Sequence, residues 1–120
     1  EAPILEPVRA SFRDDEALRW TRVHDLPDFV FFDHSIHISE GIGCQSCHGQ
    51  VDQMPLMWKD STLNMEWCLD CHRAPENFVR PRSEVFNMNW KPGPDHDGAQ
   101  LVREYGVQTA QLTDCSICHR

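Results

Sequence analysis

Apolar residues along the chain come in short clusters, separated by prolines, glycines and charged residues. Residues 1–19 combine two prolines with a run of charge, and this favours a strap or linker with one or two helical turns. Between Trp20 and Asp33 the residues become β-branched and aromatic on both sides of the turn Leu26-Pro27-Asp28. This pattern predicts a short two-stranded β-ribbon.

Helical patterns follow in the second half of the chain. Ser61 and Thr62 are suitable caps for a helix that runs through Leu63, Met65 and Trp67. Asp97 is a suitable cap for a helix over residues 98–105, and Thr113 or Asp114 for a last short helix. Residues 74–97, rich in proline, predict an irregular segment. We therefore expect a small, mostly α fold with few regular elements.

Composition and charge restrict the fold and the partners. The 120 residues, of which 25 % are charged, predict one domain over residues 20–120 with a thin core of its own. The formal net charge is −8, which argues against a nucleic acid as partner. No apolar run approaches the roughly 20 residues of a membrane-spanning helix.

One short signature occurs three times. It reads Cys-x-x-Cys-His, and its residues are Cys44, Cys47 and His48; Cys68, Cys71 and His72; and Cys115, Cys118 and His119. This is the attachment site of c-type haem, in which two thiols bind the vinyl groups and the histidine binds the iron. The sequence predicts three covalent haems, whose rings would supply the apolar core that the chain lacks.

Zinc binding and disulfide formation are two other possible roles of the six cysteines, and both fit the sequence less well. Structural zinc takes its ligands in groups of four, so three pairs would leave one pair unused. A disulfide framework gives no reason for a histidine after each second cysteine. Haem attachment accounts for all the cysteines and for three of the seven histidines.

Four histidines remain for the distal side of three irons: His24, His34, His37 and His96. His34 and His37 lie three residues apart, so on a helical turn they share one side and reach two different haems. For the haem on Cys68 and Cys71 we expect His24, with His96 and Met65 as alternatives. Met65 lies close before Cys68 and is more readily a packing residue. Bis-histidine iron has no open position for a substrate, so we expect no enzymatic activity.

The run Phe32-Asp33-His34-Ser35-Ile36-His37, followed by the first motif, resembles the class III multihaem cytochromes. That resemblance implies a class III-like three-haem domain in which His34 shares an iron with His48, and His37 with His119. Four longer runs resemble the C-terminal part of the pentahaem cytochrome subunit of alternative complex III: Val23–Val30, Val51–Met54, Met65–Cys68 and Ser83–Met88. In that subunit two further haems and a membrane anchor come first.

The sequence therefore predicts an electron-transfer wire outside the cytoplasm, in the periplasm of a bacterium, because c-type haem is attached there. The resemblance implies redox protein partners, among them an iron–sulfur or molybdopterin-type subunit of a membrane complex. The chain opens without a targeting signal, so we expect a processed form, a fragment or a stand-alone relative. Two alternatives stay open: a haem-stacking subunit of a larger complex or filament, and a haem enzyme or gas sensor.

Overall fold

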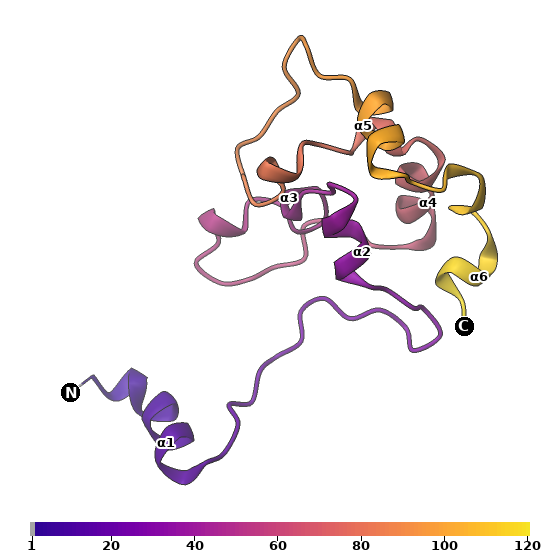
Figure 1. The fold of residues 1–120 in the computed structure, drawn as a ribbon. Helices are drawn as coiled ribbons and strands as arrows, with labels where there is room; N and C mark the ends of the chain where they lie inside the picture. The colour runs from indigo at the N-terminus through magenta and orange to yellow at the C-terminus, as the bar shows by residue number, and fades with distance from the viewer. Residues whose placement is uncertain (1) are drawn as a thin grey trace.

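The computed structural model describes residues 2–120, and its regular elements are all short helices (Figure 1). The α-helices are α1 (Glu6–Asp14), α2 (His34–Ser39), α3 (Cys44–His48), α4 (Met65–Arg73), α5 (Gly98–Tyr105) and α6 (Cys115–Cys118). The 3-10 turns are η1 (Pro3–Leu5), η2 (Val51–Gln53), η3 (Pro75–Asn77), η4 (Arg82–Glu84) and η5 (Thr109–Gln111). The fold is thus small, helical and rich in loops, as the sequence predicts.

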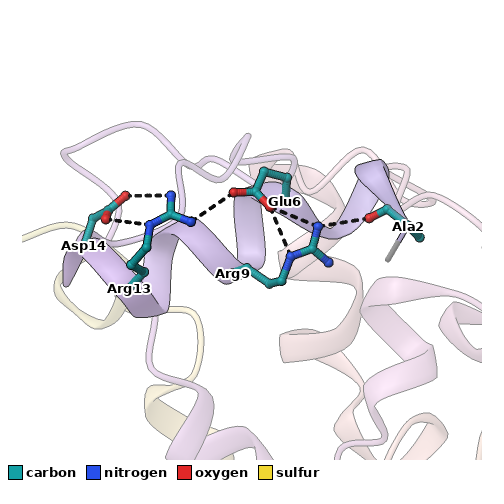
Figure 2. Close-up of polar contacts among 5 residues, drawn as sticks. All are labelled: Ala2, Glu6, Arg9, Arg13 and Asp14. Atoms are coloured by element: carbon teal, nitrogen blue, oxygen red, sulfur yellow. Dashed lines mark hydrogen bonds and ion pairs between the residues drawn. The ribbon is translucent and has the colours of Figure 1, made fainter.

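Helix α1 stands apart from the other helices, at the end of a long connection (Figure 1). On its polar side Glu6 forms ion pairs with Arg9 at 2.9 Å and with Arg13 at 3.1 Å, and Arg13 forms a further ion pair with Asp14 (Figure 2). The apolar side is open to solvent, and Phe12 is 92 % exposed. Residues 2–19 are therefore more helical than the predicted strap, and none of the residues of α1 is buried.

The expected β-ribbon over residues 20–33 is wrong, since the described part of the chain contains no strand, only two isolated bridges. Pro27 turns the chain, and its carbonyl accepts a hydrogen bond from the N–H of Val30 at 2.8 Å. Val30 then forms an antiparallel bridge with His119, and Phe31 N–H donates to the carbonyl of Cys118 at 2.7 Å. The β-like residues therefore pair with the far end of the chain and not with one another.

Side-chain caps fix the starts of three helices. Asp97 accepts a hydrogen bond from Gln100 N–H at 2.8 Å and begins α5, as the sequence predicts. Helix α4 begins later than expected, because Asn64 and neither Ser61 nor Thr62 caps it, accepting from Trp67 N–H at 2.9 Å. The third cap is Asp33, which begins α2.

Very little of the chain is buried. The fully buried apolar side chains of the described residues are Val79 and Val85, whereas large aromatic side chains such as Phe29 and Phe86 are more than half exposed. Burial of two valine side chains stabilises the fold by only about 3–6 kcal/mol. This is far below the free-energy cost of the conformational entropy lost on ordering a domain of this size. The fold needs another apolar component.

The irregular segment 74–97 lies against the first motif. Ile42 forms a bridge with Val79, and Arg80 N–H donates to the carbonyl of Gly41 at 2.9 Å. Gly41 has φ +77° and a Cβ there would crowd the ring of Tyr105, so glycine is required. Helix α5 packs on η3, where a Cβ at Gly98 would overlap the carbonyl of Glu76. Segment 74–97 therefore holds the backbone just before the first Cys-x-x-Cys-His motif in place.

Candidate haem-binding site

Each Cys-x-x-Cys-His motif forms a short helix or the last turns of one. The first is α3, whose start is held by a hydrogen bond from Cys44 N–H to the carbonyl of Val85 at 3.1 Å. The second occupies the last turns of α4, and the third is α6 with His119 as the residue after it. A single helical turn places both cysteines and the histidine of a motif on neighbouring positions of one side.

All six thiols of the three motifs are free. Burial is the main cause that raises the pKa of Cys47 and of Cys71 to about 11, and the charge of Cys68 adds to both shifts. Burial also raises the pKa of Cys68, with a further contribution from Cys118. Cysteines of the first and second motifs, and of the second and third, thus lie close enough to affect each other's pKa.

His34 and His48 lie opposite each other at the first motif. Their ring centroids are 6.2 Å apart, and the ring planes are within 8° of parallel. Two imidazoles that bind one metal ion at about 2.0–2.1 Å have centroids on the order of 6 Å apart. The pair therefore has the separation needed for an iron between the rings. Burial lowers the pKa of His48, which favours the neutral, ligating form.

His37 and His72 make a second pair, again with centroids 6.2 Å apart and with planes inclined by 31°. His37 Nδ1 lies 2.8 Å from the carbonyl of Asp33, and His72 Nδ1 lies 2.7 Å from the carbonyl of Leu112. Because an Nδ1–H donated to a carbonyl leaves Nε2 as the ligand atom, both rings are set for metal binding through Nε2. Burial lowers the pKa of His37, which keeps its ring neutral.

The second pair differs from the sequence expectations. The resemblance implied that His37 shares an iron with His119, and we expected His24 beside His72. The structure instead brings His37 to His72, while the ring of His24 meets that of His48 edge-on at 4.5 Å. A centroid distance of 4.5 Å is too short for a metal ion between two rings. The reason is the fold of α2, whose single turn projects His34 and His37 toward different motifs.

The remaining candidate ligands of the haem irons lie outside the two histidine pairs. His119 stacks on Phe29 at 5.9 Å, and His96 lies edge-on to Trp90 at 5.1 Å, beside an open hollow. Met65 is the first residue of α4 and is 62 % exposed. His24 Nε2 is buried and has no hydrogen-bond partner within the described chain.

The donor set fits haem better than it fits zinc or disulfides. Within residues 2–120 no group of three or more His, Cys, Asp or Glu side chains has the arrangement of a metal cluster. The histidines instead occur in opposed pairs, which is what an iron in a porphyrin leaves for the protein to supply. Large exposed aromatic side chains, Phe29, Phe31 and Phe32 among them, give the apolar contact that such rings need.

Comparison with protein families agrees with this geometry. Residues 30–120 match the family described as cytochrome c7 and related cytochrome c. The chain belongs to this multihaem cytochrome c family. No curated protein matches the chain. Proteins of the family carry electrons through covalently bound haem c and are typically periplasmic, and none of the described helices is long and apolar enough to span a membrane.

Membership confirms the broader part of the sequence prediction, a multihaem cytochrome c of an electron-carrier family. Sequence reasoning did not find the carbonyl of Leu112 at His72, nor the side chain of Arg80, which lies behind the first motif. A backbone carbonyl has no sequence signal. Arg80 had one weak signal, because it is a charged residue that directly follows the apolar pair Phe78 and Val79.

Proposed function

We propose that the protein carries three covalent c-type haems and passes electrons along them between two redox partners. The observation that carries this proposal is the His37–His72 pair, whose rings stand 6.2 Å apart with both Nδ1 atoms against carbonyls. The His34–His48 pair supports a second six-coordinate iron. Haem supplies the one-electron chemistry, and the chain positions the ligands.

The residues in this proposal have three roles. Thioether bonds form at the cysteines of the three motifs, and the proximal ligands are His48, His72 and His119. The distal ligands are His34 for the first iron and His37 for the second. For the third iron we propose His24, because the two pairs leave it and His96 over, and its Nε2 is buried without a partner among residues 2–120. Its ring, which lies edge-on to His48, would have to turn toward the third motif. Met65 remains a packing residue in this proposal, because it begins α4, the helix that carries the second motif.

Bis-histidine ligation suits electron transfer. Two imidazoles saturate the iron, so no position is open to a substrate, and they hold the reduction potential lower than a His/Met pair does. Cysteines of the first and second motifs, and of the second and third, affect each other's pKa, which supports haems close enough for electrons to pass from one to the next. The acidic chain, with net charge −8, favours partners with basic or neutral docking surfaces.

A second candidate function is that of a subunit inside a larger respiratory assembly. The open apolar side of α1, with Ile4 84 % and Phe12 92 % exposed, favours it. The sequence resemblance to the pentahaem subunit of alternative complex III points the same way, and it implies an iron–sulfur or molybdopterin-type neighbour. In either case we place the protein in the periplasm.

Intact mass under denaturing conditions, followed by absorption spectra, tests the proposal. Protein matured in a host that attaches c-type haem should have the mass of the chain plus three haems. Reduced protein should show low-spin haem that does not bind carbon monoxide. Fewer than three haems on fully matured protein, or a mass with zinc, would overturn the proposal.

A further inference from the structure

Arg80 is a buried cation beside the first haem motif. Its side chain is 4 % exposed, and it does not take part in the ion pairs found among the described residues. Its Nη atoms contact neutral groups only: the carbonyls of Glu84 and Asn87, and the side chains of Gln45 and Ser46. Its Nε has no partner. The guanidinium also lies 4.6 Å from the ring centroid of Trp90.

This position is built into the motif. Gln45 and Ser46 are the two residues between the attachment cysteines of α3, so Arg80 contacts the turn that carries the first haem. A Cβ at Gly43, the residue before that turn, would overlap the guanidinium. The segment is fixed further by the hydrogen bond from Arg80 N–H to Gly41. The guanidinium is therefore held at the motif by both backbone and side-chain contacts.

The charge of Arg80 is not cancelled by its neighbours. An arginine stays protonated in proteins, although burial lowers the pKa of this one. The carboxylate of Glu84 attracts the guanidinium of Arg80, but the two form no ion pair among the described residues. The Glu84 carboxylate instead accepts a hydrogen bond from Asn87 Nδ2 at 2.7 Å. Cys44 also attracts it as a thiolate, and that attraction disappears once the sulfur is a thioether.

We propose that Arg80 is a fixed internal charge that raises the reduction potential of the haem on Cys44 and Cys47. Ferric iron carries one more positive charge than ferrous iron, so a nearby cation disfavours the oxidised state. The effect is large when the cation is buried, because water and salt screen it weakly. The first haem thus accepts electrons more readily than its bis-histidine ligation alone would allow. The inference rests on the proposed function, since it needs a haem on these cysteines.

The test is an NMR-monitored redox titration of the mature protein, with the first haem identified by contacts of its methyl groups to residues 44–48. In Arg80→Gln we expect the equilibrium constant for reduction of this haem to fall on the order of tenfold. For one electron this is a fall of about 59 mV in its reduction potential. The other two potentials should move less. Arg80→Lys should keep most of the wild-type potential, because it keeps the charge.

Arg82 gives a matched control. Its side chain is exposed and lies 4.1 Å from the ring of Tyr105, so Arg82→Gln removes the same charge two residues away and should change the potential little. Arg80→Met supplies a second test if Arg80→Gln does not fold: it removes the charge, keeps an unbranched side chain that can pack in the same place, and should lower the same potential.

The possible outcomes are distinct. Absence of the first haem in the wild-type protein would refute the proposed function. With three haems present, an unchanged first potential in Arg80→Gln would overturn this inference, because it would show that the charge is neutralised in the holoprotein. Equal shifts in Arg80→Gln and Arg82→Gln would also overturn it, as would an unchanged potential in Arg80→Met.

Discussion

Val30 and His119 form an antiparallel bridge that joins the beginning of the haem domain to its last motif. The same contact places Phe29 on the ring of His119, with centroids 5.9 Å apart. Four residues after Val30 comes His34, the first distal ligand in the proposal. The segment before α2 therefore connects the third motif to the histidines that serve the first and the second.

His34→Ala and His37→Ala should each convert one haem, and a different one, to a high-spin form that binds carbon monoxide. The physical reason is that each variant empties one distal position while the other rings keep their ligands. Absorption and electron paramagnetic resonance spectra measure the change. Ser35→Ala, between the two histidines on α2, is the control and should stay low-spin. If both histidine variants kept three low-spin haems, the ligand assignment would be wrong.

His24→Ala should also give one high-spin haem, whereas His96→Ala should leave all three low-spin. His24 Nε2 is buried without a partner, while His96 lies at an open hollow beside Trp90. His24→Met should instead raise one potential, because a thioether ligand favours ferrous iron. The opposite result, with a high-spin haem in His96→Ala only, would make His96 the third distal ligand.

Removal of residues 1–18 should leave the haem spectra and the three potentials unchanged. Helix α1 contacts η1 and stands apart from the haem motifs (Figure 1), so its loss exposes no haem. Thermal unfolding followed at the Soret band should keep its midpoint within a few degrees. A loss of haem signal in the shortened protein would place residues 1–18 inside the domain.

Asn64→Ala should destabilise the protein by about 1 kcal/mol, since its side chain caps α4 and an alanine leaves the N–H of Trp67 without that acceptor. Thr62→Ala is the matched control, and its effect should be close to zero because Thr62 does not cap the helix. Chemical denaturation of the oxidised protein compares the two. Equal losses for both variants would contradict the role of Asn64.

The chain without haem should not fold. Val79 and Val85 are its fully buried apolar side chains in the described region, and such burial is too small to offset chain entropy. Protein made without haem attachment should show a largely disordered circular dichroism spectrum and no cooperative thermal transition. A cooperative transition in that material would show that the haems are not needed for the core.

Local signals in the sequence predicted the local structure well. Asp97 and the apolar side of residues 98–105 predict α5 because a cap and its helix are neighbours in the chain. The three motifs predict haem attachment for the same reason. The β-ribbon failed since residues 20–33 find their partner at Cys118 and His119, almost the whole chain away.

The pairing of His37 with His72, and the placement of Arg80 behind α3, also depend on contacts between distant segments. Spacing along the chain predicts that His34 and His37 reach different irons, yet it does not say which irons. That choice follows from how α2 lies relative to α3 and α4, since it brings His34 to His48 and His37 to His72.

The nearly empty core has a consequence for biogenesis. A chain whose main buried apolar side chains are two valines does not collapse by itself, so its six thiols stay within reach of the enzymes that attach haem. Folding then becomes the last step of maturation, and each thioether bond adds a piece of the interior. We therefore expect a molecule that lacks one of its haems to remain unfolded and to be degraded by the proteases of its compartment.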